Sequence, residues 1–259
     1  MSQNSSNASD EARVQSPKRR WWMAIVLPLW VLAGLLAAQL VVTGALWALR
    51  ALHIQIDGIN QNIFMTIVAV LIYIICLVFV IGIPWLIWRS RVRLSDIGLN
   101  RLPTWTDILM APAGMVIYFV ISAFLMFLAT SWLPWFDVSQ AQDTGFSQLG
   151  QRYEYILAFL TLVIIAPIAE EILFRGYLLG KISKYMPVWL AILITSVLFG
   201  FVHGAWNLAI DTFALSVVLC LLRISTKSLW APILLHTMKN SLAFYILFIN
   251  PALLTTLGG

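Results

Sequence analysis

The chain has 259 residues, of which 61% are hydrophobic and only 10% are charged, and its mean hydropathy is +0.90. These values lie far from the composition of a soluble globular domain and indicate an integral membrane protein. The formal net charge of +5 is not accompanied by a base-stacking or phosphate-binding motif. We therefore expect a lipid bilayer and no nucleic acid as a partner.

The polar N-terminal segment comprises residues 1–20. Residues 1–17 are rich in Ser, Asn and Asp, and Lys18, Arg19 and Arg20 follow directly before the first apolar run. So few apolar groups cannot compensate for the entropy lost on ordering, and we expect a disordered cytoplasmic tail. The apolar run that follows is too long for a signal peptide and lacks a small-residue cleavage site, so we expect it to be retained as a helix.

Seven apolar runs are candidates for membrane-spanning helices, each of which needs about 20 residues at a rise of 1.5 Å per residue. They occupy residues 21–48, 62–88, 106–130, 155–173, 187–203, 207–222 and 229–249. We predict an all-α polytopic membrane protein with seven to eight transmembrane helices, which form one domain over residues 21–250.

The basic residues favour one orientation of these helices. If the N-terminus is cytoplasmic, 13 of the 16 Lys and Arg residues lie on the inner side, Arg50 and Arg152 lie outside, and Lys239 lies within the last run. The inner residues are Arg13, Lys18, Arg19, Arg20, Arg89, Arg91, Arg93, Arg101, Arg175, Lys181, Lys184, Arg223 and Lys227. Because Lys and Arg concentrate in cytoplasmic loops, we predict a cytoplasmic N-terminus.

Two adjacent carboxylates, Glu170 and Glu171, lie inside the fourth apolar run. An ionised side chain near the bilayer centre costs about 2.5 to 3.5 kcal/mol on insertion scales, so such residues are rarely without a function or a partner. Glu171 and Arg175 are four residues apart, in the order that favours an ion pair on one helix face. Glu170 points about 100° away and has no partner in its own helix. We expect Glu171 to be structural and Glu170 to be available for chemistry.

Two further pairs, Phe199 with His203 and His236 with Asn240, place polar groups at membrane depth. A carboxylate, two imidazoles and an amide can bind or activate a water molecule. With a divalent metal such as zinc, the ligands would be Glu170, His203 and His236, with water in the fourth position. With no cofactor, Glu170 would be the general base, and histidine and asparagine donors would stabilise the oxyanion. Both routes lead to hydrolysis of an acyl bond.

The sequence of the fourth run, Glu170-Glu171-Ile-Leu-Phe174-Arg175-Gly176, resembles the Glu-Glu-x-x-Phe-Arg-Gly motif of the CAAX-protease and bacteriocin-processing (Abi) family of intramembrane proteases. The pairs Phe199-x-x-x-His203 and His236-x-x-x-Asn240 are similar to the second and third motifs of that family, in the same order. The resemblance covers residues 155–245, which we predict to be the protease core.

This resemblance implies an all-helical fold of about eight spans, with a site below the membrane surface that opens to the cytoplasmic side. It implies that Glu170 activates water with His203 as its partner. His236 and Asn240 would bind a metal or stabilise the oxyanion. The supporting residues would be Glu171, Arg175 and Phe199.

We therefore predict an intramembrane endopeptidase, similar to CAAX prenyl endopeptidases, that hydrolyses a peptide bond in a membrane-associated peptide or protein. The alternative is a non-catalytic membrane scaffold, immunity or regulatory protein of the same fold. A transporter or channel would also explain buried charge, but a transporter is expected to show repeat symmetry, and no repeat is apparent in the sequence. The short loops and the lack of an ER-retrieval tail favour a prokaryotic plasma membrane.

Two other features concern charge and depth. Asp211 and Lys239 are the remaining charges at membrane depth, and we expect them to pair across helices.

His203 lies about 24 Å from the inner end of its run and His236 only about 10 Å from the inner face. Straight upright helices would not bring these histidines together, so we expect helix tilt, a longer helix through residues 176–180, or a helix break near Pro232.

Overall fold

The computed structural model describes residues 21–54, 58–138, 140, 145–146 and 149–253. The expected disordered tail, residues 1–20, lies outside the described residues. Within them the regular secondary structure is helical, with no strand. Six helices are long and apolar enough to cross a membrane, namely Met23–Ala51, Gln61–Ile87, Trp105–Trp132, Arg152–Ile182, Trp206–Thr226 and Trp230–Ile249. With the shorter apolar helix Val188–Phe201, they correspond to the seven runs, and the prediction of an all-α polytopic membrane protein is confirmed.

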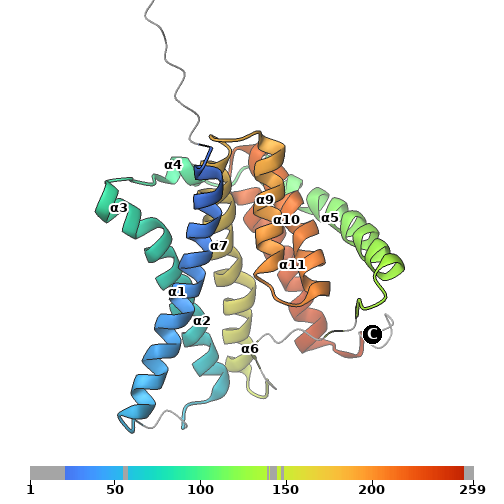
Figure 1. The fold of residues 1–259 in the computed structure, drawn as a ribbon. Helices are drawn as coiled ribbons and strands as arrows, with labels where there is room; N and C mark the ends of the chain where they lie inside the picture. Colours follow the sequence, from blue (N-terminus) through green and yellow to red (C-terminus); the bar gives the residue numbers. More distant parts are fainter. Residues whose placement is uncertain (1–20, 55–57, 139, 141–144, 147–148, 254–259) are drawn as a thin grey trace, which may run out of the picture.

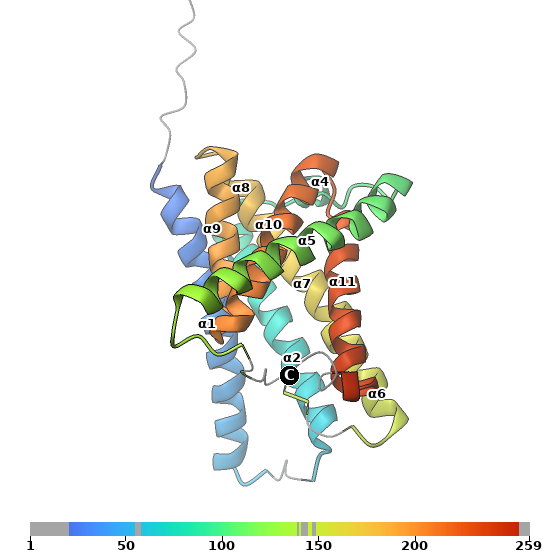
Figure 2. The ribbon, with the colours of Figure 1, turned by 90° about the vertical axis from the view of Figure 1, so that its right-hand side faces the viewer.

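The first half of the chain forms a helical hairpin followed by a separate oblique helix. The hairpin consists of α1 (Met23–Ala51) and α2 (Gln61–Leu77), which continues through the π-helical segment η1 (Val78–Gly82) into α3 (Ile83–Trp88). A short helix, α4 (Leu94–Ile97), leads to α5 (Trp105–Trp132), which packs against α10 and α11. Figure 2 shows α5 running obliquely across the other helices.

The second half of the chain begins with one long helix made of five segments. These are α6 (Arg152–Phe159), η2 (Leu160–Ile165), α7 (Ala166–Glu171), η3 (Ile172–Leu179) and α8 (Gly180–Ile182), where η2 and η3 are π-helical. It is followed by α9 (Val188–Phe201), α10 (Trp206–Thr226) and α11 (Trp230–Phe244), which ends in η4 (Tyr245–Ile249).

Three of these helices begin at residues that cap free backbone N–H groups. The Asn60 side chain accepts from two N–H groups in the first turn of α2. Asp107 accepts from the backbone N–H of Thr104 at 2.8 Å at the start of α5, and Glu154 accepts from the backbone N–H of Gln151 at 2.8 Å at the start of α6. Such caps satisfy donors that a helix start leaves unpaired.

The α9–α10 hairpin turns back inside the bundle instead of crossing it, as Figure 1 shows. The 14 residues of α9 reach about 21 Å, which is less than the roughly 30 Å hydrocarbon thickness of a bilayer. The turn contains Gly204, whose φ of +80° suits glycine. The two helices approach closely at Gly200, where a Cβ would lie 2.6 Å from the carbonyl oxygen of Ala209. This turn places His203 at the same depth as the other catalytic candidates.

The two ends of the bundle differ in basic residues. The segments after η1, around α4, between α8 and α9, and between α10 and α11 gather at the end where α1 begins (Figure 1). These segments contain six of the nine described Lys and Arg residues that we assigned to the inner side. Their common location agrees with the assignment, while the membrane side that this end faces stays a prediction.

Candidate active site

The two glutamates lie in α7, the short α-helical segment between the π-helical segments η2 and η3. A π-helical segment widens the helix and changes which side chains share a face, and such segments are frequent at functional sites. Glu171 and Arg175 remain in contact across the α7–η3 junction, whereas Glu170 faces a cavity. The predicted divergence of the two carboxylates is therefore present.

Asn240 hydrogen-bonds to a backbone carbonyl of this helix that Pro167 leaves without a donor. In the π-helical register the N–H of Ala166 bonds to the carbonyl of Thr161, so the carbonyl of Leu162 would pair with the next residue, Pro167. Proline has no N–H. The Asn240 side-chain amide donates to the Leu162 carbonyl at 2.8 Å instead. Asn240 thus joins α11 to η2 and also lines the cavity.

Glu171 accepts two side-chain hydrogen bonds on one oxygen. Arg175 Nη1 lies 2.9 Å and His236 Nδ1 2.8 Å from Glu171 Oε1, and the side chains of Glu171 and Arg175 are completely buried. The predicted Glu171–Arg175 ion pair is present, but the contact with His236 was not predicted. Because the carboxylate can only accept, Nδ1 of His236 donates, and Nε2 of the ring points toward Glu170. A carboxylate that holds one nitrogen in this way fixes the ring orientation.

The second histidine, in the turn after α9, is oriented by the backbone of that helix. His203 Nδ1 lies 2.6 Å from the Phe199 carbonyl oxygen, so Nδ1 donates and Nε2 carries the lone pair in the neutral ring. The Phe199 ring is fully buried and contacts the rings of Phe174, His203 and His236, with centroid distances of 4.9, 4.8 and 5.8 Å. The Arg175 guanidinium carbon lies 4.3 Å from the Phe199 ring centroid. Phe199 therefore connects all three motifs.

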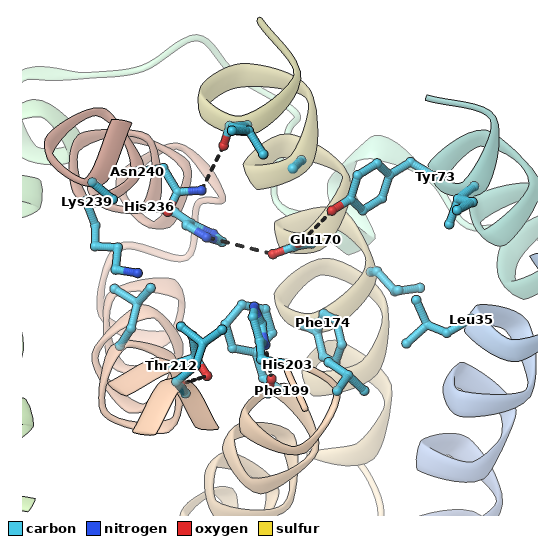
Figure 3. A pocket seen from close by; sticks show the side chains of 18 of the residues that line it. Leu35, Tyr73, Glu170, Phe174, Phe199, His203, Thr212, His236, Lys239 and Asn240 are labelled. Atoms are coloured by element: carbon cyan, nitrogen blue, oxygen red, sulfur yellow. Dashed lines mark hydrogen bonds and ion pairs between the residues drawn. The ribbon is translucent and has the colours of Figure 1, made fainter. Parts of the chain in front are cut away.

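Glu170 lies between Tyr73 and His236, as Figure 3 shows. The Tyr73 hydroxyl donates to Glu170 Oε1 at 2.6 Å, and His236 Nε2 lies 3.8 Å from Glu170 Oε2. A water molecule at about 2.8 Å from both of these atoms fits the 3.8 Å separation. The Glu170 side chain is 16% exposed, so a small molecule can reach it.

Tyr73 was not found from the sequence. It lies near the middle of the 62–88 run, whereas membrane tyrosines concentrate at the interfaces. A hydroxyl in the middle of the membrane needs a hydrogen-bond partner. The position of Tyr73 in this run is therefore the sequence signal that would have identified it as a site residue.

The cavity beside Glu170 has a volume of about 650 Å³ and a largely apolar lining. Its walls come from the α1–α2 hairpin, the long helix 152–182, the α9–α10 turn, α10 and α11. The lining includes Leu32, Leu35, Leu36, Gln39, Tyr73, Glu170, Phe174, Phe199, His203, Thr212, His236, Lys239, Asn240, Leu247 and Phe248. All four predicted catalytic residues therefore line one cavity.

The structure brings His203 and His236 to one depth without a break in α11. Pro232 lies in the first turn of α11, where proline is tolerated, and the helix continues without interruption. The start of α11 is held by the Leu229 N–H, which donates to the Gly98 carbonyl at 2.9 Å. Figure 2 shows α11 beginning deeper in the bundle than the end of α10. The long helix also continues through residues 176–180, as one of our alternatives expected.

The donor types suit zinc, but their arrangement does not form a metal site. Carboxylate oxygens and the Nε2 atoms of neutral histidines are typical zinc ligands. Among the residues that the structure describes, however, no group of three His, Cys, Asp or Glu side chains is close enough to hold one metal ion. The arrangement of Glu170, His203 and His236 as it stands therefore does not fit the predicted metal site.

The predicted pair of Asp211 and Lys239 is present next to the cavity. Lys239 Nζ lies 3.3 Å from Asp211 Oδ2, while Tyr118 and Ser122 of α5 donate to Asp211 Oδ1 at 2.6 and 2.7 Å. Three donors therefore stabilise the Asp211 carboxylate at membrane depth. The Lys239 side chain also lines the cavity.

Comparison with known proteins places these residues in a family context. Residues 152–242 match the family model described as type II CAAX prenyl endopeptidase Rce1-like, and this segment contains all seven predicted catalytic and supporting residues. No solved structure matches the chain.

Three curated relatives match parts of the chain. An uncharacterised 24.3 kDa protein of Escherichia coli is 36% identical over 94 residues, which are 34% of this chain and 43% of that protein. The Bacillus subtilis protein named "Putative membrane peptidase YdiL" is 36% identical over 78 residues, 30% of this chain and 32% of that protein. In both cases the match covers less than half of the relative's length.

The third relative is matched over most of its length. The UPF0177 protein YxdF of Lactococcus lactis is 30% identical over 150 residues, which cover 55% of this chain and 70% of that protein. On this extent of similarity, together with the family model, the chain belongs to the type II CAAX prenyl endopeptidase Rce1-like family of membrane proteases.

Proposed function

We propose that this protein is an intramembrane endopeptidase in which Glu170 activates a water molecule for attack on a peptide bond. The observation that carries this proposal is the position of Glu170, whose carboxylate faces a cavity with one oxygen bound to Tyr73 and the other 3.8 Å from His236 Nε2. A general base needs this accessibility and a fixed orientation.

In the proposed reaction, Glu170 Oε2 and the Nε2 lone pair of His203 accept hydrogen bonds from the attacking water. Glu170 removes one proton as the water oxygen attacks the carbonyl carbon, and a tetrahedral oxyanion forms. His236 lies between Glu171 and Glu170. When its Nε2 also carries a proton, that Nε2–H can donate to the oxyanion. The second amide hydrogen of Asn240, beside the one that Leu162 accepts, is the other donor.

The intermediate collapses when the C–N bond breaks. As this bond breaks, Glu170 returns its proton to the leaving nitrogen, which departs as an amine. The water oxygen and its second proton remain in the new carboxylic acid, which then releases that proton to the amine or to solvent. Atoms and charge balance in this sequence, and every step uses residues that line the cavity.

The largely apolar cavity wall supports a membrane-associated peptide or protein as the substrate. Leu32, Leu35 and Leu36 of α1 and Leu247 and Phe248 of η4 line it, and such side chains bind apolar groups rather than hydrated peptides. We assign the chain to a prokaryotic plasma membrane with a cytoplasmic N-terminus. The count of basic residues and the three bacterial relatives support this assignment.

The test is cleavage of a membrane-peptide library by the purified full chain in detergent, with and without a strong chelator. Glu170→Gln should lower kcat by at least about 100-fold, the lower range of general-base contributions, and His236→Ala should also lower it. Asp96→Asn is the matched control, because it makes the same acid-to-amide change at an exposed residue of α4. Chelator sensitivity would indicate a metal-dependent reaction.

The opposite result would favour the alternative function. If no form cleaves and the Glu170→Gln variant keeps the cellular phenotype of the wild type, the protein is not a protease. A non-catalytic scaffold, immunity or regulatory protein of this fold would then be the better assignment.

A further inference from the structure

Tyr73 hydrogen-bonds to Glu170 and comes from neither the three motifs nor the matched segment 152–242. We propose that Tyr73 is a positioning residue for Glu170, so that the α1–α2 hairpin completes the active site. This proposal rests on the proposed function and adds the residue that orients its general base.

The hydrogen bond from Tyr73 determines how the Glu170 carboxylate faces the water. The Tyr73 hydroxyl donates to Glu170 Oε1 at 2.6 Å, and Oε2 is left toward His236 (Figure 3). The terminal torsion of a glutamate has a broad, roughly two-fold preference. The two oxygens are chemically equivalent, so the phenol fixes the plane of the carboxylate. Without the phenol, the group can rotate away from the plane in which one oxygen faces His236. Tyr73 therefore selects the orientation that the reaction needs.

A second hydrogen bond holds α2 in register with the long helix 152–182. Asn60, the N-cap of α2, donates through its side-chain amide to Glu154 Oε1 at 2.7 Å. Tyr73 lies about 20 Å further along α2, and Glu170 lies about 24 Å beyond Glu154 along its own helix. These similar lengths allow the pairs Asn60–Glu154 and Tyr73–Glu170 to form side by side.

Packing alone gives little control over this register. Only Asn62 and Cys76 of α2 are buried, and most of the helix surface is apolar and partly or fully exposed to the membrane region. In lipid, apolar side chains gain little by choosing one helical neighbour over another, so polar contacts contribute more to position. The Tyr73–Glu170 hydrogen bond is thus a specific link between the hairpin and the catalytic helix.

The experiment compares wild type, Tyr73→Phe and Tyr245→Phe in the cleavage assay, with the melting temperature of each variant. Tyr245→Phe is the matched control, because it removes the same hydroxyl from a side chain that is 46% exposed on η4. We expect Tyr73→Phe to lower kcat by about 10- to 100-fold, the scale of a misplaced catalytic group. KM should stay within about two-fold, because the phenol acts on Glu170 and not on substrate binding. Tyr245→Phe should match wild type.

A second measurement tests the hydrogen bond without any substrate. In the wild-type background, Tyr73→Phe should lower the melting temperature. In the Glu170→Ala background it should have no such effect, because the hydrogen-bond partner of Tyr73 is already absent. Equal effects in both backgrounds would overturn the proposal.

The kinetic outcomes separate the two proposals. If wild type cleaves and Tyr73→Phe keeps its kcat, or raises only KM, Tyr73 does not position Glu170, and the proposed function stands. If wild type and all variants fail to cleave, the proposed function and this inference fall together.

Discussion

Arg175→Met is the substitution that most directly tests how buried charge is balanced at the site. The Glu171 and Arg175 side chains are both 0% exposed and lie 2.9 Å apart. Removal of one partner from a buried ion pair costs about 3 to 5 kcal/mol, because the other charge stays buried without its counter-charge. The guanidinium also stacks 4.3 Å from the Phe199 ring centroid, a contact worth up to about 2 kcal/mol when desolvated. We therefore expect the free energy of unfolding to fall by at least about 3 kcal/mol.

The double variant Glu171→Leu/Arg175→Met separates stability from catalysis. It removes both charges, and a buried pair replaced by apolar residues is often no less stable than the original. Stability should therefore largely recover. Cleavage should not recover, because His236 Nδ1 loses the carboxylate that holds it at 2.8 Å.

The measurement is reversible unfolding in mixed micelles together with kcat per folded molecule. A loss below about 1 kcal/mol in Arg175→Met would refute the reasoning, because it would mean that the Glu171 carboxylate is stabilised by other groups. Full activity of the folded double variant would refute the orienting role that we assign to Glu171.

Two further predictions concern the polar groups around the cavity. Asn240→Ala leaves the Leu162 carbonyl unpaired and should cost about 1 to 3 kcal/mol of stability. Adding Pro167→Ala supplies the missing N–H and should restore much of the melting temperature. An undiminished loss of melting temperature in the double variant would contradict our explanation of this hydrogen bond. Asp211→Asn leaves the Lys239 ammonium without its counter-charge and should also cost about 1 to 3 kcal/mol. In thermal unfolding, Asp211→Asn and Lys239→Met combined should cost less than the sum of the single changes, and strictly additive costs would argue against a coupled pair.

The features that could be predicted from the sequence depend on local geometry or on the cost of burying charge. The Glu171–Arg175 pair follows from a spacing of four residues on a helix, since such residues share a face whatever surrounds them. The Asp211–Lys239 pair follows from the small number of charges at membrane depth, each of which needs a partner. Both pairs are present in the structure.

The features that were missed depend on how helices are placed against one another. Tyr73 and Glu170 are 97 residues apart in the chain, and no spacing rule connects them. The relative depth of the two histidines depends on where α9 turns back and where α11 begins, which the apolar runs do not reveal. The suggested break near Pro232 does not occur, because α11 begins only two residues before it and the proline falls in the first turn.

Adjacent carboxylates in one helix can have opposite tasks because the helix points them at different neighbours. Glu171 is fully buried and accepts from Arg175 and His236 on a single oxygen, so its charge is compensated and its position fixed. Glu170 is partly exposed, and its hydrogen bond from Tyr73 engages only one of its two oxygens, which leaves Oε2 toward the cavity and His236. His236 contacts one glutamate with each ring nitrogen. A displacement of Glu171 is therefore expected to reach Glu170 through this imidazole, so the structural glutamate contributes to the orientation of the reactive groups as well as to stability.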